Sequence, residues 1–390
     1  MKKFMKTFSI MLVLLVAFGA CAPKKSEAPA PAPAPAPQPS GPFANVEPLK
    51  TPTELGIGLL SGTHASSIVY FIGKLGGFEK VGIKPKITAF ANGPVMVEAM
   101  NSGAWDFGVY GLGGTLAGSL GYGAKVVGAA TRDAGSLQFF APNDSPIVKS
   151  GKNMPQYPSL YGTKEIWKGK EIYLPTGTTL HFTLATALSK FGLTESDVKI
   201  VHMDVPNINT ALRAGQCPVG ALWTSLPYGD INEKFTPVIK GADLVSLVNV
   251  LAANPDSYKD PVKTEAIKKM IELYYLTVEW LWDGTKLNEK NKQQAFDWYL
   301  QWNEENGVKA NARDIEMLML DSRHYTLEES YKLATTKTPD GKMTLMEQAN
   351  YDPLAFFIKL NRYKPEDGEK LLAGTHDGKY VIEIYEKRKK

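Results

Sequence analysis

The stretch that decides the fold begins at Lys168 and reads KGKEIYLPTGTTLHFTLATAL. Residues 172–174 have the composition of a short buried strand, and a loop of hydroxyl residues and glycine follows at 175–179. Apolar residues then recur with the period of one helix face, at Leu180, Leu184, Ala187, Leu188 and Phe191. Three threonines therefore stand where a helix begins, at Thr176, Thr178 and Thr179. Free N–H groups and the positive end of the helix dipole favour an anion or another strong acceptor at such a place.

The chain repeats this order of strand, loop and helix. The repetition indicates an α/β architecture and not a single isolated loop. After the helix, strands are expected around 198–200 and 221–223, with a short helix at 210–214 between them. Before it, the same plan appears as strands at 55–60, 83–90 and 105–110, with loops at 61–64, 92–94 and 111–115. Pro85 in the second of these strands suits a strand at a sheet edge or an early position within the strand. Two α/β lobes of this kind enclose a cleft lined by the loops at their strand ends.

The cleft loops supply the candidate ligand-binding residues. The first lobe offers Ser61, Thr63, His64, Gly93, Gly113 and Thr115, and the second offers Thr176, Thr178, Thr179, His181, Trp223 and Thr224. For His64 and His181, hydrogen bonding to loop backbone is an alternative to ligand contact. Trp223 either covers an apolar part of the ligand or walls the cleft. Arg132 follows the strand expected at 125–130 and either pairs with an anion or serves at the surface or hinge.

The first residues predict export. A basic start, an apolar run over 8–18 and the small residues before Cys21 define a secretory signal over 1–20. A cysteine at the cut point resembles a bacterial lipoprotein signal, in which Cys21 is lipidated; ordinary secretion is the alternative. Lys, Pro and Ala dominate 21–50, which predicts an extended tether. We expect the body to sit in the cell envelope, lipid-anchored to a membrane and facing the periplasm or the exterior.

The sequence also excludes several classes of protein. The net charge of +4 is spread out, with no basic stripe and interleaved aromatics, so nucleic acid is not an expected partner. P-loop, complete dinucleotide-binding and nucleophile-elbow motifs are absent from the sequence. The five histidines never stand at H-x-x-x-H spacing, and Cys217 is the only cysteine besides Cys21. We therefore expect no enzymatic activity, no metal and no cofactor.

Taken in order, these motifs resemble the periplasmic binding proteins for nitrate, sulfonate, taurine and thiamine-pyrimidine precursors. The residues that carry the resemblance are 168–181, Leu212–Gly215 and Ala221–Trp223 in the second lobe, and 61–65, 92–94, 100–108 and 111–115 in the first. Thr326–Glu329 and the helical tail to about 360 fit the C-terminal part of the family. The resemblance implies an α/β, type II periplasmic-binding-protein fold. Its lobe 1 would comprise 51–137 plus 246–390, whose helical tail would pack on that lobe, and its lobe 2 would comprise 138–245. The implied partners are a small-molecule ligand and the permease and ATPase subunits of an ABC importer.

The chain differs from this family at a position expected to determine ligand specificity. The family often carries Trp-(Glu or Asp)-Pro at the end of the last second-lobe strand, whereas this chain has Trp223-Thr224-Ser225. A missing carboxylate favours an anion or a neutral acceptor over a cationic solute. We expect an anionic, sulfonate-like solute, with a thiamine-pyrimidine precursor as the alternative. An enzyme of the thiamine-pyrimidine synthase type and a ligand-free scaffold are the competing classes of function.

Overall fold

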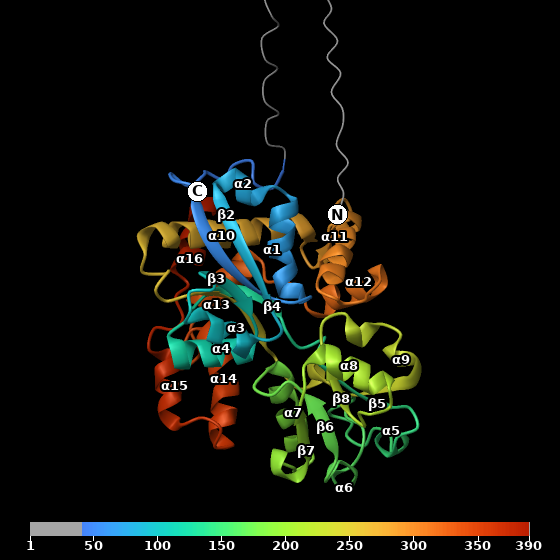
Figure 1. Ribbon diagram of the computed structural model, residues 1–390. Helices are drawn as coiled ribbons and strands as arrows, with labels where there is room; N and C mark the ends of the chain where they lie inside the picture. The colour runs from blue at the N-terminus through green and yellow to red at the C-terminus, as the bar shows by residue number, and fades with distance from the viewer. Residues whose placement is uncertain (1–40, 390) are drawn as a thin grey trace, which may run out of the picture. The chain divides into compact units, whose positions relative to one another are not determined.

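The computed structural model describes residues 41–389, and these contain two mixed five-stranded sheets. The first sheet has the order β2-β1-β3-β10-β4 and the second the order β7-β6-β8-β5-β9. In each sheet the first three strands are parallel and the fourth runs antiparallel to both of its neighbours. The two sheets thus repeat one topology, and we call each sheet with its helices a lobe (Figure 1).

Lobe 1 is built from both ends of the described chain. Its first part holds β1 (Thr53–Leu60), α1 (His64–Lys74), α2 (Gly77–Val81), β2 (Ile83–Phe90), α3 (Gly93–Met100), β3 (Phe107–Tyr110), α4 (Leu112–Ala117), η1 (Gly118–Tyr122) and β4 (Lys125–Arg132). Its second part holds β10 (Val248–Ala253), α10 (Pro261–Leu281), β11 (Trp282–Asp283), β12 (Lys286–Leu287), α11 (Lys292–Glu305), α12 (Ala312–Asp321), α13 (Leu327–Thr335), α14 (Leu345–Lys359), α15 (Pro365–Leu372) and α16 (Lys379–Lys389).

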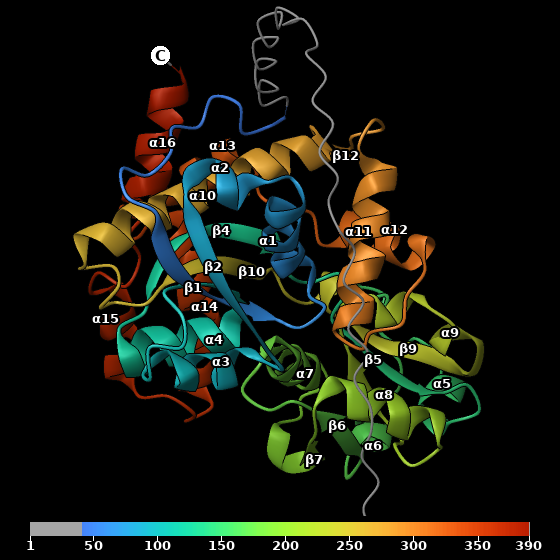
Figure 2. The ribbon, with the colours of Figure 1, turned by 45° about the horizontal axis from the view of Figure 1, so that its top comes forward.

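Lobe 2 is one continuous segment between these parts. It holds β5 (Gln138–Pro142), α5 (Pro146–Lys149), α6 (Lys164–Trp167), β6 (Glu171–Leu174), α7 (Thr179–Lys190), η2 (Glu195–Asp197), β7 (Lys199–His202), α8 (Val205–Arg213), β8 (Gly220–Leu222), η3 (Leu226–Tyr228), α9 (Ile231–Lys234), β9 (Phe235–Lys240) and η4 (Gly241–Asp243). Figure 2 shows α7 and α8 on lobe 2 below the sheet of lobe 1.

Two connections join the lobes, one from β4 to β5 and the other from β9 to β10. Backbone hydrogen bonds tie them together: Asp133 N–H donates to Leu247 O at 2.9 Å, and Gly241 N–H donates to Leu137 O at 2.8 Å. The crossing is therefore a short paired ribbon, which is the form expected of a hinge.

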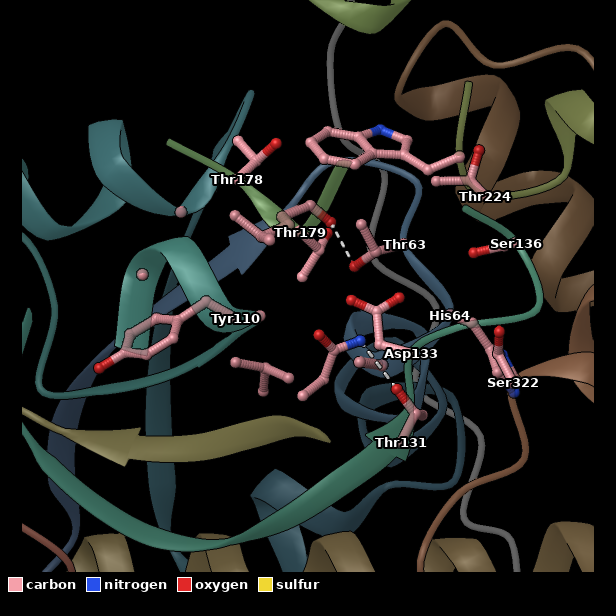
Figure 3. Close-up of a pocket in the computed structure, with 18 of the residues that line it drawn as sticks. Thr63, His64, Tyr110, Thr131, Asp133, Ser136, Thr178, Thr179, Thr224 and Ser322 are labelled. Atoms are coloured by element: carbon pink, nitrogen blue, oxygen red, sulfur yellow. Dashed lines mark hydrogen bonds between the residues drawn. The ribbon is translucent and has the colours of Figure 1, made fainter. Parts of the chain in front are cut away.

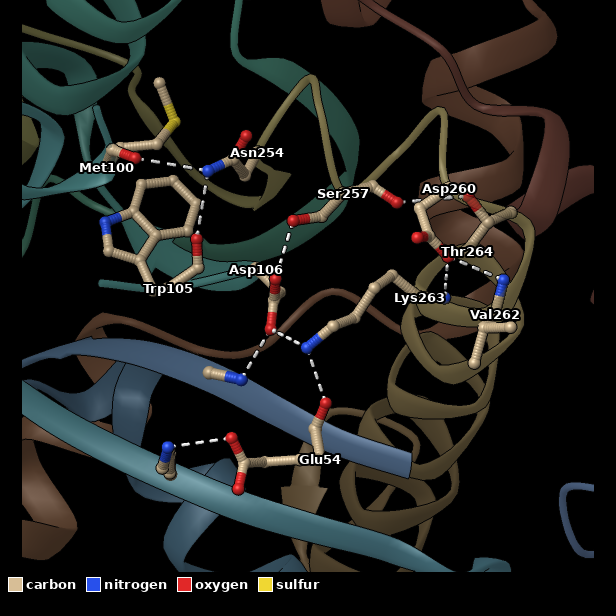
Figure 4. A network of polar contacts seen from close by, with 12 residues as sticks. Glu54, Met100, Trp105, Asp106, Asn254, Ser257, Asp260, Val262, Lys263 and Thr264 are labelled. Atoms are coloured by element: carbon tan, nitrogen blue, oxygen red, sulfur yellow. Dashed lines mark hydrogen bonds and ion pairs between the residues drawn. The ribbon is translucent and has the colours of Figure 1, made fainter. Parts of the chain in front are cut away.

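A partly buried polar network fixes the long helix α10 to the first sheet (Figure 4). The Asp106 carboxylate accepts hydrogen bonds from Gly56 N–H at 2.7 Å, Lys263 Nζ at 2.8 Å and Ser257 Oγ at 2.6 Å. Lys263 Nζ also donates to Glu54 O at 2.6 Å. Asp106, part of the sequence resemblance, thus has a structural role and does not line the cavity described below.

The predicted strands are confirmed, whereas one predicted loop is wrong. Strand β2 lies at a sheet edge and Pro85 is its third residue, in agreement with both positions that suit proline, and Cys217 is buried. The glycine-rich stretch expected as a loop is instead the helix α4, because its glycines permit close packing. A Cβ on Gly114 would lie 2.7 Å from Cγ of Tyr110.

The C-terminal tail does not pack on lobe 1 alone. Leu354 and Phe357 of α14 and Leu371 of α15 share an apolar cluster with α7 of lobe 2. Phe182 of α7 meets Phe357 with ring centroids 5.5 Å apart. Among the described residues, no helix combines the length and apolar character needed to cross a membrane.

Candidate functional site

A cavity of about 620 Å³, part of it open to solvent, lies where strand ends of the two sheets meet (Figure 3). Lobe 1 contributes residues after β1, β3 and β4, and lobe 2 contributes residues after β6 and β8. The lining residues are Leu60, Thr63, His64, Ala65, Gly93, Pro94, Val109, Tyr110, Gly111, Gly113, Gly114, Thr131, Asp133, Ser136, Thr178, Thr179, Trp223, Thr224, Asn249, Leu318 and Ser322.

Three helices begin at this cavity. Helix α1 starts at His64, α3 at Gly93 and α7 at Thr179, and all three residues line the space. The first N–H groups of a helix have no partner within the helix and carry partial positive charge. The helix starts therefore offer a ligand donors from both lobes.

The lobes touch directly at backbone level beside the cavity. A Cβ on Gly113 of α4 would lie only 2.1 Å from the carbonyl oxygen of Gly177 in lobe 2. No side chain larger than hydrogen fits between them. The structure is consequently that of a closed arrangement of the two lobes.

Asp133 places a buried carboxyl group in the cavity. Its side chain points into the space bordered by Thr63 and Thr179 (Figure 3), and the residue is only 9% exposed. Burial raises the pKa of Asp133 from 3.8 to about 7, against the opposing effect of hydrogen bonds from Thr179 and Asn249. Asn249 also donates to Thr131 Oγ1 at 2.9 Å.

His64 is the second ionisable group facing the cavity. Its ring lies 5.7 Å from that of Tyr299 and 4.0 Å from that of His324. Burial, and then the neighbouring His324, hold the pKa of His64 well below its ordinary value. Within residues 41–389 neither ring nitrogen has a hydrogen-bond partner. The ring is therefore a neutral group that can still donate to or accept from a ligand.

Thr224 is strained in the cavity wall. It directly follows Trp223 at the end of β8 and has φ of 60°, in the left-handed region that β-branched residues rarely adopt. Its hydroxyl is buried and has no partner in the described part of the chain. Strain and an unsatisfied polar atom at the same cavity residue are typical of a ligand site.

The structure brings eight of the thirteen predicted site residues to the cavity. These are Thr63, His64, Gly93, Gly113, Thr178, Thr179, Trp223 and Thr224. The other five, Ser61, Thr115, Arg132, Thr176 and His181, are not among its lining residues.

Arg132 and His181 make structural contacts instead. The Arg132 guanidinium lies 2.9 Å from Oε1 of Glu329 and 4.2 Å from the ring of Tyr325. His181 accepts a hydrogen bond at Nδ1 from Gly177 N–H at 2.9 Å, and its Nε2 lies 2.6 Å from Oε1 of Glu195. His181 therefore hydrogen-bonds to loop backbone, which is the predicted alternative to ligand contact.

The remaining three serve local structure. Ser61 N–H donates to Phe90 O at 2.9 Å in the turn after β1. Thr115 Oγ1 donates to Gly111 O at 3.2 Å inside α4. Thr176 N–H donates to Nδ1 of His202 at 3.1 Å, so the start of the loop is held by β7.

Sequence reasoning missed the cavity residues that come from the lobe crossings. Thr131 lies on β4 and Asp133 and Ser136 follow it, Asn249 lies on β10, and Ser322 follows α12. The available signal was the run of polar residues directly after the strand at 125–130. Of that run only Arg132 was singled out, and its side chain pairs elsewhere. No cluster of three or more metal-ligating side chains occurs in 41–389.

Comparison with known proteins agrees with this geometry. Residues 65–234 match the family model described as "NMT1/THI5 like". A Brachyspira hyodysenteriae protein named "Putative ABC transporter periplasmic binding protein" is 24% identical over 257 residues, covering 66% of this chain and 72% of that protein.

Two solved structures show the same fold. The alkanesulfonate-binding protein SsuA from Xanthomonas axonopodis pv. citri, bound to MOPS, superimposes with a TM-score of 0.63 and 16% identity, covering 84% of this chain and 99% of that one. The periplasmic nitrate-binding protein NrtA from Synechocystis PCC 6803 gives a TM-score of 0.67 and 11% identity, covering 87% and 90%. The two-lobed periplasmic-binding-protein fold and the resemblance seen in the sequence are therefore confirmed, residues 65–234 being NMT1/THI5-like and the chain being similar to periplasmic solute-binding proteins of the ABC import type.

Proposed function

We propose that this protein captures a small organic solute between its lobes and delivers it to the permease and ATPase subunits of an ABC importer, without changing it chemically. The observation that carries the proposal is the cavity itself, which both lobes line and which the Gly113–Gly177 contact closes. Ligands of such proteins are held by a hinge movement that removes them from water.

We further propose that the solute has an anionic, sulfonate-like end. No lysine or arginine side chain lines the cavity within the described residues, so donors would come from the starts of α1, α3 and α7 and from Thr178, Thr179 and Thr224. The alkanesulfonate-binding neighbour supports this class. A thiamine-pyrimidine precursor is the second candidate, favoured by the carboxyl group of Asp133.

Titration of the purified body with alkanesulfonates, nitrate and thiamine-pyrimidine precursors tests this proposal. Trp223 lines the cavity, so we expect a saturable change in tryptophan fluorescence that is much smaller in Trp223→Phe. The solute should be recovered unchanged after incubation. Chemical conversion of the solute would favour the enzyme alternative. No fluorescence change with any of these compounds, with the fold intact, would contradict solute capture.

We propose the lobe boundaries at 137/138 and 245/246. Support comes from the strands: β4 and β10 belong to the first sheet and β5 and β9 to the second, so both cuts fall in the hinge ribbon. Limited proteolysis should be slow in this ribbon when ligand is bound, because its backbone groups are paired.

We propose that Cys21 carries the membrane anchor. The signal over 1–20, Cys21 and the tether over 21–50 lie outside the described residues, except for the last ten positions of the tether. A single acyl chain attaches a protein only marginally, so the multi-chain lipid of bacterial lipoproteins is required. Cys21→Ser should leave the precursor uncut or move the protein to the soluble fraction. A membrane-bound, normally cut mutant would contradict lipidation.

A further inference from the structure

The cavity has an uneven distribution of charge. Its lining includes three ionisable side chains, Asp133, His64 and Tyr110, and no lysine or arginine within residues 41–389. Burial raises the pKa of Tyr110 and lowers that of His64, so both are neutral near pH 7. Asp133 is therefore the one lining group among the described residues that can bring a full charge to the ligand near neutral pH.

The nearest cation along the chain does not neutralise Asp133. Arg132 is the adjacent residue, but its guanidinium pairs with Glu329 of α13, and Glu329 also pairs with Arg323 at 2.6 Å. The groups that α7 and β10 direct toward Asp133 are the side chains of Thr179 and Asn249, which are uncharged. A carboxylate buried among neutral donors is incompletely compensated, and a cation or N–H donor on the ligand would stabilise it.

A backbone hydrogen bond holds Asp133 in place where the two lobes are joined. Its N–H is bonded to Leu247 O, so it belongs to the paired ribbon that joins the lobes. Thr179 reaches it from lobe 2, and Thr131 and Asn249 border the same space from lobe 1. The carboxyl group is thus available at the hinge, whereas the helix starts of α1 and α7 lie on opposite lobes.

We propose that Asp133 determines specificity by binding an amino or amino-heterocyclic N–H group of the solute, while N–H groups at the helix starts receive its anionic end. This inference rests on the proposed function and narrows it to a solute with an acceptor end and a nitrogen donor end. A simple alkanesulfonate or nitrate would fill only half of the site and leave the carboxyl group unpaired.

Matched pairs of ligands test the assignment by calorimetry. The first pair is 2-aminoethanesulfonate and ethanesulfonate, which differ by the amino group; the second is 4-aminopyrimidine and 4-methylpyrimidine. We expect the protein to prefer the amino member of at least one pair by about tenfold or more. Asp133→Asn should reduce that preference to less than about threefold. Asp144→Asn, which removes an exposed carboxylate from a turn of lobe 2, should leave it unchanged.

The pH dependence gives a second readout. An alkyl ammonium group stays charged from pH 6 to 8, whereas Asp133 loses its proton over this range. The preference for 2-aminoethanesulfonate should therefore grow with pH in the wild type and stay flat in Asp133→Asn.

The outcomes separate this inference from the proposed function. Equal affinity within both pairs, or an amino preference that survives in Asp133→Asn, overturns the role of Asp133 and leaves solute capture intact. An Asp133-dependent preference in the pyrimidine pair alone supports Asp133 and contradicts the sulfonate class. Binding of neither pair, with a native circular dichroism spectrum, overturns both.

Discussion

Thr224 shows how one residue can serve binding at the expense of stability. A left-handed backbone costs an ordinary residue about 1–2 kcal/mol, and only glycine adopts it freely. The Thr224 side chain is buried and its hydroxyl has no partner within 41–389, so no hydrogen bond of this hydroxyl in the described protein offsets the cost. A hydrogen bond to the bound solute is the compensation that the site permits.

Replacing Thr224 tests this account with a matched pair of variants. Thr224→Gly and Thr224→Ala both remove the hydroxyl, but only glycine relieves the strain. We expect Thr224→Gly to be more stable than Thr224→Ala by about 1 kcal/mol in urea unfolding, the reverse of the order at ordinary positions. Both should bind ligand about 2- to 13-fold more weakly, the range that one uncharged hydrogen bond covers. Equal stabilities, or the usual order, would show that the residue is not strained.

The buried Asp133 predicts a stability that falls as pH rises. The folded protein holds a proton on this carboxyl up to about pH 7, whereas the unfolded chain releases it near 3.8. Between these values the unfolded state binds fewer protons, so the free energy of unfolding decreases with pH and levels off above about 7. Asp133→Asn lacks this titration.

Urea unfolding of the ligand-free protein at pH 4.5, 6 and 8 measures the effect. The stability of Asp133→Asn relative to wild type should increase across this series, with an upper bound of about 4 kcal/mol for a pKa raised from 3.8 to about 7. Taking the difference removes the other titrating groups. A difference that is constant with pH would mean that the folded-state pKa of Asp133 is ordinary.

The adjacent residues Arg132 and Asp133 show what sequence reasoning can and cannot find at single residues. Patterns located eight cavity residues, because strand ends and helix starts are visible as local periodicity. They could not tell Arg132 from Asp133, since the partners that decide their roles, Glu329 and Asn249, are more than a hundred positions away. Long-range pairing is not contained in a local pattern.

Among the secondary-structure elements, prediction succeeded where one face of a helix meets one core. The apolar residues predicted for one helix face at 180–188 are buried on α7. The prediction that the helical tail packs on lobe 1 failed for α14 and α15, because these helices contact both lobes. Arg362, between them, pairs with Glu195 of lobe 2, and although burial opposes it, His181 and Arg362 hold the pKa of Glu195 below its usual value.

The contact between α14 and α7 should matter for stability. Phe357 is buried against Phe182 and lies 6.3 Å, centroid to centroid, from the ring of His181. Phe357→Ala should lower the free energy of unfolding by about 3–5 kcal/mol, as expected for truncation of a buried phenylalanine. Val262→Ala, at a residue that is 56% exposed, should change it by less than about 0.5 kcal/mol. Similar small losses in both variants would show that α14 is not docked on α7.

At the scale of the whole molecule, contacts between the lobes hold the closed form. Tyr228 Oη donates to Asp321 Oδ2 at 2.9 Å, and Asn92 Nδ2 donates to Asp204 Oδ1 at 3.2 Å. Burial and the nearby Asp321 raise the pKa of Tyr228, so it remains a donor across the physiological range. These few bonds, together with the α7–α14 cluster, oppose opening, and a ligand shifts the balance only by its own preference for the closed form.

Closure can be blocked at one atom without disturbing either lobe. A methyl group on Gly113 would meet the Gly177 carbonyl oxygen at 2.1 Å, a clash that exists only while the lobes touch. In the open form the same alanine lies within α4, where it favours the helix.

Gly121→Ala is the matched control, because a Cβ at that position has nothing within 4 Å. Saturating ligand should reduce the radius of gyration of the wild type and of Gly121→Ala in solution scattering, but not that of Gly113→Ala, whose affinity should fall about tenfold or more. If Gly113→Ala compacts and binds like the wild type, the Gly113–Gly177 contact does not belong to the ligand-bound state, and the hinge account of capture is wrong.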